Sequence, residues 1–473
     1  MRALTACLTL SILSSGIFTA QATAREIVIE DEHLPRNIIY LIGDGMGPAY
    51  TSAYRYYSDN PDTKPVEKTI FDDLLVGMAS TYPDDDTYVT DSAAAATALA
   101  TSTKSYNGAI SVDHQHHALP TLLEIAKHKG KTTAIVVTSQ INHATPASFL
   151  AHNESRGNYN AIADSYLTNL IKGKPVADLM LGGGTKYFVR EQRDLTSEFE
   201  ALGYQYIDRL EQLDEVETLP ALGLFAPSGL PAALGSDDPL RLTTMTHSAL
   251  RLLSSQSAPF VMMIEGSQID WCGHSNDIVC AMTEMHDFAN TLERVKRYID
   301  NHPDTLLVAT ADHSTGGLTL GKNGVYQWKG KQLQMITMLP EEIADKLIAS
   351  PKILDKPDSF NTFWSEYIGI IQSVEAQDKL RQQILANLQQ DKGDLQTAKD
   401  KVETLIKSAI DTLTHTGWTT SGHDGIDVQI FAYGRGSHYF AGHMDNTEIA
   451  ANLIEMINSE KASHNALLLE PRI

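Results

Sequence analysis

The sequence predicts an α/β fold: a largely parallel central sheet sandwiched by helices, with a helical surface insertion. Short apolar runs rich in β-branched residues alternate along the chain with longer helix-like segments. Runs that are apolar at every position suit strands buried on both faces of a parallel sheet. Residues that can bind metal ions follow most of these runs, and open α/β sheets bind ligands at the carboxyl ends of their strands.

Five runs are predicted to form the buried strands: residues 37–42, 134–138, 259–264, 305–310 and 428–433. The predicted helices between them are residues 119–128, 159–171, 282–301 and 447–458. Candidate ligands follow four of the runs, and His423 stands just before the fifth. One such coincidence can arise by chance, but four together indicate a ligand site at one edge of the sheet.

Residues 1–24 are predicted to be a cleaved signal peptide. Arg2 supplies a positive charge, an apolar stretch follows, and Ala22-Thr23-Ala24 gives the small-x-small pattern of a cleavage site. The protein is therefore expected in the periplasm or outside the cell.

The chain is strongly acidic. It carries 37 basic and 59 acidic residues, a net charge of −22, and loss of residues 1–24 removes only one of the basic residues. Such a surface disfavours nucleic acid and anionic membranes as partners. A site for an anionic substrate would need strong local positive charge, which bound metal ions usually provide.

Only Cys272 and Cys280 remain beyond the signal peptide, too few for a disulfide framework. One bridge between them and two free thiols are both open alternatives. A regular helix across the eight steps would hold the two sulfurs too far apart to bond.

Residues 322–416 are predicted to be an insertion without a chemical motif of its own. A Gln-, Lys-, Asp- and Leu-rich stretch, residues 375–412, is expected to form two surface helices. The insertion is interpreted as a solvated appendage, with a dimer contact or a lid over the active site as alternatives.

Ser92 is the candidate nucleophile. It follows Thr90-Asp91 and precedes an alanine-rich stretch, residues 93–100, which is a strong helix former. Free backbone N–H groups and the helix dipole favour an oxyanion at such a position. The alternative is a serine that serves only as the helix N-cap.

Asp270 and His274 have the spacing that places both side chains on one face of a helical turn, where they can bind one ion. Asp312 and His313 are adjacent, and a loop just past a strand end can turn both inward. His423 lies in a predicted loop. Carboxylate and imidazole ligands together suit zinc.

Thr145 and Glu265 offer only oxygen ligands, which suit magnesium. Asp44 follows the first predicted strand, and its two carboxylate oxygens can bridge two ions.

In these segments the chain resembles the alkaline phosphatase family, most of all its marine bacterial members. The matching segments are Gly43-Asp44-Gly45-Met46-Gly47, residues 90–98, Ala144-Thr145-Pro146, residues 265–270 with His274, Thr310-Ala311-Asp312-His313, and His423 with Ala432-Tyr433-Gly434. They stand in the family's order and span nearly all of residues 25–473, which implies a single catalytic domain.

The resemblance implies two zinc ions and one magnesium ion per chain, held beside one nucleophile. It assigns the first zinc to Asp270, His274 and His423, and the second to Asp44, Asp312, His313 and the Ser92 oxygen. It assigns magnesium to Asp44, Thr145 and Glu265. Arg156 matches the family arginine that binds two phosphate oxygens, a geometry that lysine does not supply.

The function implied is hydrolysis of small phosphate monoesters at alkaline pH through a phosphoserine intermediate, with release of an alcohol and inorganic phosphate. The alternatives are a phosphodiesterase or sulfatase on the same scaffold, or a non-catalytic phosphate-binding protein. The resemblance also implies a homodimer, with a monomer as the alternative.

Two positions depart from the enteric pattern of the family, which has Asp where this chain has His143 and Lys where it has Trp271. His143 is expected to bond a water on the third ion, or to bind that ion directly and shift the site towards zinc. Trp271 removes a cation near the phosphate, which predicts weaker product binding and faster turnover.

Five other histidines are not expected to bind metal. Three are predicted to lie solvated in a surface turn, and two are predicted to have structural roles after the last strand. They are His114, His116 and His117, and His438 and His443.

Overall fold

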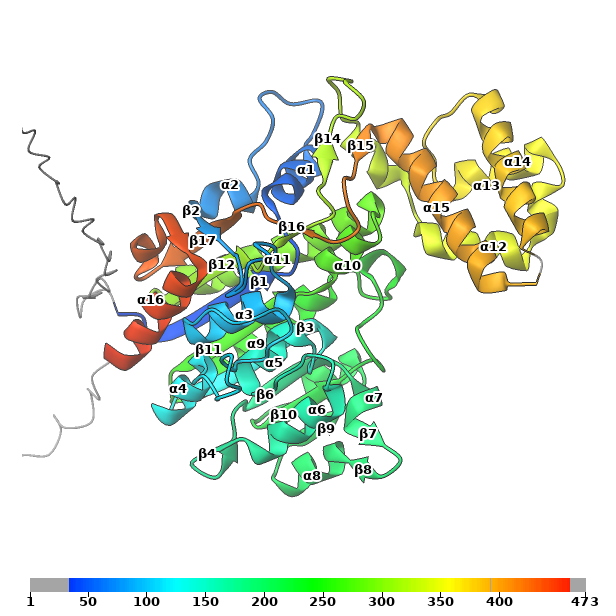
Figure 1. Cartoon of the computed structure of the whole chain (residues 1–473). Helices are drawn as coiled ribbons and strands as arrows, with labels where there is room; N and C mark the ends of the chain where they lie inside the picture. Colours follow the sequence, from blue (N-terminus) through cyan, green and yellow to red (C-terminus); the bar gives the residue numbers. More distant parts are fainter. Residues whose placement is uncertain (1–33, 392, 460–473) are drawn as a thin grey trace, which may run out of the picture.

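The computed structural model describes residues 34–391 and 393–459, and the predicted signal peptide lies outside these residues. One ten-stranded sheet runs through the body of the molecule, with helices on both faces and a helical arm to one side (Figure 1). This is the predicted α/β architecture. None of the helices in the described ranges is long and apolar enough to cross a membrane.

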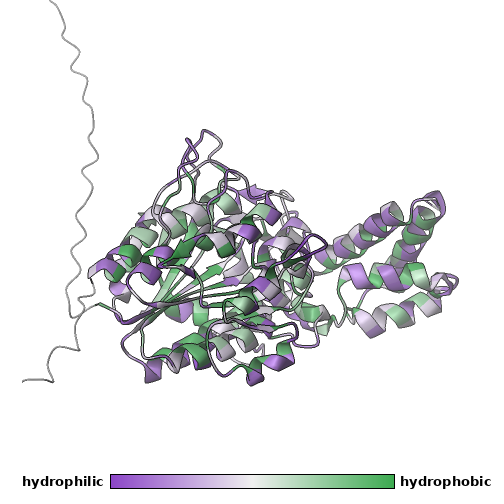
Figure 2. Cartoon of the chain, turned by 90° about the horizontal axis from the view of Figure 1, so that it is seen from below, coloured by the Kyte–Doolittle hydropathy of each residue, from purple (hydrophilic) through white to green (hydrophobic). Residues whose placement is uncertain are grey.

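All five predicted runs are strands of the ten-stranded sheet. In spatial order its strands are β18 (Gly442–Asp445), β2 (Leu75–Ser80), β17 (Val428–Gly434), β12 (Thr305–Ala311), β1 (Asn37–Gly43), β11 (Phe260–Gly266), β3 (Thr132–Gln140), β6 (Leu179–Gly183), β10 (Ala221–Leu224) and β9 (Gln205–Ile207). Every residue of β1, β11 and β12 is buried, as expected for central strands covered on both faces. Figure 2 shows hydrophobic residues along the strands and polar residues on the outer faces of the helices.

Strand β17 runs antiparallel to both its neighbours, β12 and β2, whereas the other neighbouring strands of the sheet pair in parallel. Ile430, near the start of β17, therefore lies beside Thr310, near the end of β12. This reversal brings the segment that precedes β17, including His423, to the same edge as the segments that follow the parallel strands.

The helices form one layer on each face of the sheet. One layer contains α3 (Ser92–Thr101), α4 (Leu122–His128), α5 (Ala144–Leu150) and α16 (Asn446–Ser459), which pack together. The opposite layer contains α1 (Pro48–Ser58), α2 (Ile70–Leu74), α9 (Arg241–Ser254) and α11 (Ile278–Asn301). Helices α6 (Tyr159–Thr168), α7 (Thr185–Phe188) and α8 (Leu195–Ala201) lie beside β6, β10 and β9.

Capping residues and a short strand pair explain where predicted and observed helix ends differ. Helix α4 begins at Leu122 because Thr121 and Glu124 form a capping box. Helix α11 begins at Ile278, four residues before the predicted start, because the Asp277 carboxylate accepts hydrogen bonds from the next free N–H groups. Helix α6 ends at Thr168 because the next residues pair as β4 and β5.

Cys272 and Cys280 form a disulfide, which settles the alternative that the sequence left open. Helix α10 (Gln268–His274) ends before Asn276, which has a positive φ of 49°, and α11 then starts in a new direction. The break in the helix brings the two Cα atoms to 5.4 Å, a distance that a disulfide can span.

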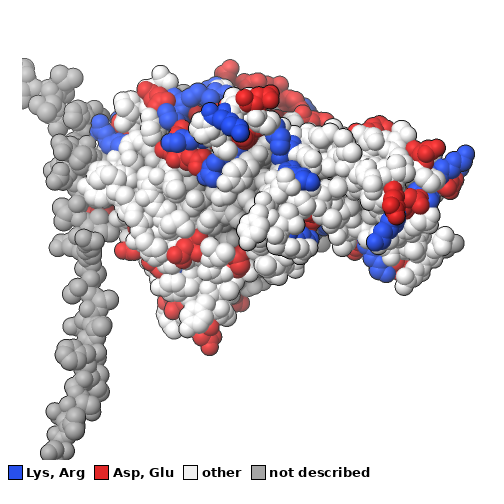
Figure 3. All heavy atoms as spheres, turned by 90° about the horizontal axis from the view of Figure 1, so that it is seen from above, with Lys and Arg blue, Asp and Glu red and all other residues white. Residues whose placement is uncertain are grey.

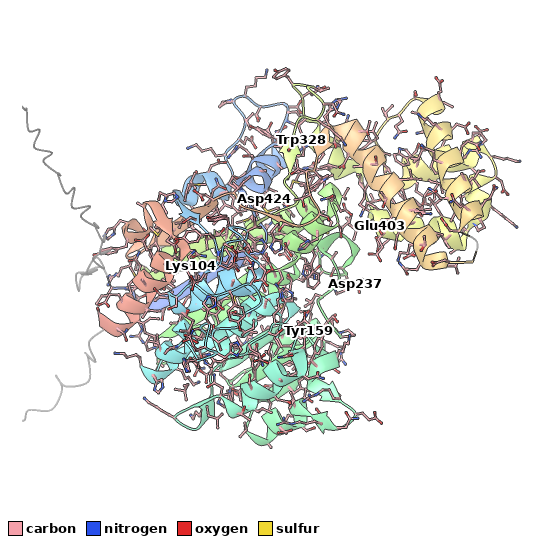
Figure 4. All side chains as sticks on the ribbon, viewed as in Figure 1. Lys104, Tyr159, Asp237, Trp328, Glu403 and Asp424 are labelled. Carbon is pink, nitrogen blue, oxygen red and sulfur yellow. A yellow bond between two sulfur atoms is a disulfide. The ribbon has the colours of Figure 1, made fainter. Side chains whose placement is uncertain are left out.

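The segment between Leu320 and Thr416 stands out from the sheet as a group of helices (Figures 1 and 2). It contains η4 (Gly330–Met335), α12 (Pro340–Ala349), η5 (Pro351–Leu354), α13 (Pro357–Tyr367), α14 (Val374–Gln390) and α15 (Leu395–Thr414). The two predicted surface helices are α14 and α15. At the base, β14 (Thr319–Leu320) pairs with β15 (Thr416–Gly417), and Trp328 donates a hydrogen bond to Thr416 (Figure 4).

The remaining short elements connect these parts. They are β4 (Leu170–Ile171), β5 (Lys174–Pro175), β7 (Val189–Arg190), β8 (Arg193–Asp194), β13 (Ser314–Thr315), β16 (His423–Asp424), η2 (Leu210–Glu215), η3 (Ala233–Gly235) and η6 (Ser437–Phe440).

Candidate active site

The predicted ligands gather at the carboxyl edge of four neighbouring strands. Asp44 follows β1, Glu265 lies near the end of β11, and Asp312 follows β12. His143 and Thr145 come just after β3, at the start of α5. Because β12, β1, β11 and β3 are adjacent in the sheet, their ends bring these side chains together.

Two further segments complete the cluster. Asp270 and His274 lie on α10, and their carboxylate and imidazole are 3.3 Å apart, as the helical spacing predicted. His423 lies in β16, a two-residue strand paired with β13, where a loop was predicted. Its neighbour Asp424 accepts hydrogen bonds from Ser314 and Gly317, which fixes this pairing (Figure 4).

Three groups of side chains can each hold a metal ion, because in each group one ligand atom per residue lies within 4.8 Å of the others. They are Asp44, Asp312 and His313; Asp270, His313 and His423; and Asp44, His143 and Glu265. His313 belongs to two of the groups, and so does Asp44. The three groups are therefore parts of one continuous cluster.

Ser92 lies beside this cluster. It is the first residue of α3, and the N-cap is Asp91, whose carboxylate accepts a hydrogen bond from the N–H of Ala94. The alternative of Ser92 as the N-cap is therefore excluded. The Ser92 Oγ is 3.1 Å from the Nε2 of His313, and the residue is buried. The serine oxygen thus reaches the ligand cluster from a helix N-terminus.

Three histidines present Nε2 to the cluster because each Nδ1 has its own acceptor. The Nδ1 of His274 lies 2.7 Å from the Ser421 carbonyl oxygen, and the Nδ1 of His423 lies 2.8 Å from that of Thr90. The Nδ1 of His313 lies 3.2 Å from a hydroxyl oxygen in β13. A hydrogen bond from Nδ1–H leaves Nε2 unprotonated and free to bind a metal.

Several oxygens in the cluster are buried without a hydrogen-bond partner among the described residues. They are both carboxylate oxygens of Asp44, the Oδ2 of Asp312, the Oε1 of Glu265 and the hydroxyl of Thr145. Buried polar atoms rarely lack partners in folded proteins, and burying an ionised carboxylate without a counter-charge lowers the stability of the fold. Divalent cations would satisfy all of these atoms, so the residues present fit the metal ions that the sequence predicted.

The pKa values support the same conclusion. Burial raises the pKa of Asp312 to about 8 and that of Glu265 to about 7, and burial together with the nearby carboxylates raises that of Asp44. A bound cation favours the ionised carboxylate and opposes such shifts. Burial and the charge of Arg156 lower the pKa of His143 to about 3, which keeps its imidazole neutral and able to bind a metal.

Arg156 lies at the mouth of the cluster. Its Nη1 is 3.0 Å from an Asp91 carboxylate oxygen, and its Nη2 is 3.4 Å from the Nε2 of His143. Asp91 belongs to the motif around Ser92, but the sequence alone predicts no role for it. The structure shows that its carboxylate caps α3 and accepts a hydrogen bond from Arg156.

Trp271 lines the same region. Its ring meets that of His143 edge to face with centroids 5.9 Å apart. A Cβ added to Gly229 would lie 2.4 Å from the Trp271 ring, so only glycine allows this close packing. Gly229 carries no motif in the sequence and was missed.

The other histidines do not join the cluster. His114, His116 and His117 lie within 3.1 Å of the carboxylates of Asp84, Glu154 and Asp113, respectively, near the surface. His443 pairs with Asp427, and His438 lies in η6. None of the five belongs to a candidate metal group of the described residues.

Comparison with known proteins gives consistent relatives. The family model for alkaline phosphatase matches residues 35–459. Alkaline phosphatase 3 of Bacillus subtilis is 43% identical, with 95% of this chain and 96% of that protein covered. The repressible alkaline phosphatase of Saccharomyces cerevisiae is 31% identical, with 88% of this chain and 80% of that protein covered.

Solved structures agree. A cold-active alkaline phosphatase from a psychrophilic Shewanella species is 49% identical, with a TM-score of 0.81 over 89% of this chain and 99% of that one. The alkaline phosphatase of the Antarctic bacterium TAB5 is 25% identical, with a TM-score of 0.66 over 90% of this chain and 99% of that one.

Proposed function

The chain belongs to the alkaline phosphatase family and hydrolyses phosphate monoesters, and we propose that it does so through a phosphoserine intermediate on Ser92. One observation carries this proposal: the Ser92 Oγ, at a helix N-terminus, lies 3.1 Å from a buried histidine of the metal-ligand cluster. A serine that served only to begin the helix would not need such a neighbour.

The proposed cofactors are two zinc ions and one magnesium ion. Their proposed ligands are Asp270, His274 and His423 for the first zinc; Asp44, Asp312, His313 and the Ser92 oxygen for the second; and Asp44, Thr145 and Glu265 for magnesium. The buried oxygens without partners and the three histidines that present Nε2 support this set. When bound, the ions supply positive charge that favours the serine alkoxide and stabilises the leaving oxygen.

The chain's own residues act in two steps. Ser92 gives its proton to solvent, its oxygen bonds to phosphorus, and the bond from phosphorus to the ester oxygen breaks. That oxygen takes up a proton from water and leaves as the alcohol. Water then attacks the phosphoserine and loses a proton, the bond from phosphorus to the Ser92 oxygen breaks, and that oxygen takes up a proton as inorganic phosphate is released. Arg156, oriented by Asp91, is proposed to donate two parallel hydrogen bonds to phosphate oxygens.

The third ion has a specific ambiguity at His143. A ring nitrogen of His143 and one carboxylate oxygen each of Asp44 and Glu265 lie within 4.8 Å of one another. This proximity, and a pKa lowered to about 3 that keeps the imidazole neutral, support direct binding of the third ion over binding through a water. A variant of the TAB5 enzyme with Glu in place of a His has Mg bound in one of its metal sites. Metal analysis of the parent and of His143→Asp tests the assignment: more magnesium and less zinc in the variant supports direct binding, and an unchanged ratio contradicts it.

The reaction class is tested with three related substrates. We expect p-nitrophenyl phosphate to be hydrolysed far faster than its bis-ester or sulfate analogues. A dominant diesterase or sulfatase activity, or phosphate binding without turnover, would favour the alternatives. Trapping phosphate on the peptide that contains Ser92, detected by mass spectrometry after acid quench, tests the intermediate.

We also propose one catalytic domain with the insertion at residues 322–416, export through residues 1–24, and a homodimer. A monomer is the alternative, and the mass in solution decides between the two. The insertion is a dimer contact if its deletion gives monomers, a lid if deletion changes KM alone, and a solvated appendage if deletion changes neither.

A further inference from the structure

Thr315, in β13, contacts two residues of the ligand cluster. Its side chain is fully buried, and its Oγ1 donates a hydrogen bond of 2.5 Å to the Oδ1 of Asp270. The same Oγ1 is 3.2 Å from the Nδ1 of His313. One hydroxyl therefore contacts a proposed ligand of the first zinc and a proposed ligand of the second.

The direction of both hydrogen bonds follows from their partners. The Nε2 of His313 faces the Ser92 oxygen and two carboxylates. When Nε2 binds the proposed zinc it carries no proton, and the proton then lies on Nδ1. The hydroxyl of Thr315 gives its only proton to Asp270 and retains lone pairs that accept from His313. The Nδ1 atoms of His274 and His423 have backbone carbonyl oxygens as acceptors. Among these three histidines, only His313 has a side-chain oxygen as the acceptor for its Nδ1.

The surroundings of Thr315 hold it in this position. Its carbonyl oxygen accepts a hydrogen bond of 2.8 Å from the hydroxyl of Tyr50, and its backbone pairs with that of His423 across β13 and β16. A Cβ added to Gly45 would lie 2.8 Å from its Oγ1, and one added to Gly273 would lie 2.9 Å from its Cγ2. Glycine at these two positions leaves room for one packed orientation of the threonine.

We propose that Thr315 is a positioning residue that couples the two zinc sites, because its hydroxyl orients Asp270 and His313 together. This inference rests on the zinc assignment of the proposed function. Outer hydrogen-bond partners of metal ligands typically change metal affinity by about 10–100-fold when removed. Since one hydroxyl serves ligands of both ions, its loss weakens both sites in parallel.

The test compares Thr315→Val, which keeps the shape and removes the hydroxyl, with Thr315→Ser, which keeps the hydroxyl. Thr319→Val is the matched control, because Thr319 is exposed in β14 and contacts no ligand. Purified holoenzymes are equilibrated with zinc buffered by a competing chelator, and bound zinc is counted at each free concentration. We expect Thr315→Val to need about 10–100-fold more free zinc for both ions, with the serine and control variants close to the parent.

Parent-like affinity in Thr315→Val, weakening of one ion alone, or equal weakening in Thr315→Ser would each overturn the inference. If the valine variant does not fold, the parent decides through its nitrogen-15 histidine spectrum in the zinc form. The Nδ1 proton of His313 should be hydrogen-bonded and exchange slowly, and an Nδ1 proton that exchanges freely with solvent would refute the coupling. A parent that binds no two zinc ions would instead refute the proposed function, so the two failures are distinguishable.

Discussion

The carboxyl edge of the sheet and the helical insertion are built in opposite ways. At the sheet edge, charged side chains are buried against one another, and Asp44 has no hydrogen-bond partner for either carboxylate oxygen. In α15 most buried side chains are apolar, such as Val402 and Ile406, Asp411 is an exception, and charged groups such as Lys399 pair near the surface. The insertion is thus stabilised mainly by hydrophobic packing, whereas the sheet edge buries carboxylate oxygens that the proposed cations would satisfy.

The difference shows where change is tolerated. Helices that pack through apolar faces can vary in sequence while their packing is kept. A cluster of buried carboxylates and histidines cannot, because each group left unpaired costs free energy. Figure 3 shows charges of both signs along the upper margin of the body and towards the far end of the insertion, and further acidic side chains on the lower part of the body.

Replacement of the proposed nucleophile, Ser92, should give the largest effect, and this effect should be confined to the sheet edge. We expect Ser92→Ala to lower kcat/KM for p-nitrophenyl phosphate by at least about 10³-fold, or ~4 kcal/mol, because no other oxygen can form the covalent intermediate. Zinc content should be nearly unchanged, because the variant keeps every other proposed zinc ligand: five carboxylate and imidazole groups and Asp44, which the third ion shares. Retention of most of the activity would show that another group attacks phosphorus.

Removal of the metals should separate the two regions by stability. With chelator, the carboxylates of the cluster would lose the counter-charges of the proposed ions. We expect a loss of about 4 kcal/mol for each ion that was present at about 1,000 times its Kd. Amide hydrogen exchange should accelerate around Asp44, Asp270 and Asp312 and stay unchanged in α13 and α14. Equal acceleration in both regions would contradict the idea that metal ions stabilise the sheet edge and not the insertion.

Trp271→Lys should have a moderate effect on phosphate binding. A lysine ammonium beside the phosphate would strengthen binding of the product, so we expect the inhibition constant of inorganic phosphate to fall about tenfold, which corresponds to ~1.4 kcal/mol, and kcat to fall as release slows. Steady-state inhibition measures both quantities. Trp271→Phe, which adds no charge, is the control, and an unchanged inhibition constant in the lysine variant would contradict the prediction.

The smallest effect is expected where the insertion joins the body. Burial raises the pKa of Asp411, on α15, to about 7, above its value in the unfolded chain. The folded state therefore holds a proton there that the unfolded state releases, and the contribution to stability is lost as pH rises through about 7.

Asp411→Asn keeps an oxygen to accept the hydrogen bond from Trp418 and cannot ionise. We expect it to remove on the order of 1 kcal/mol of the decrease in α15 stability between pH 5 and pH 8, as measured by hydrogen exchange. A slope identical to that of the parent would show that this carboxylate does not titrate in the range.

The apolar pattern of the sequence predicted the five central strands, because strands such as β1 are apolar at every position. It predicted about half of the helices and missed others, such as α1 and α9. The strands β2, β6, β9, β10 and β18 were not predicted. They are short or carry glycines, as in the Leu-Met-Leu-Gly-Gly of β6, and partly exposed positions interrupt the apolar pattern of β2. Local sequence gives such segments little preference, and pairing with neighbours decides their conformation.

The sequence by itself determined which residue types could bind metal and attack phosphorus, and that the ligands that follow parallel strands would meet at one edge. Only the tertiary structure decided how His423 reaches that edge, because it depends on the antiparallel direction of β17. It alone also placed Thr315 between Asp270 and His313, and Asp91 against Arg156. These contacts join residues far apart in the chain through hydrogen bonds that need sub-ångström placement, and no local pattern encodes such placement.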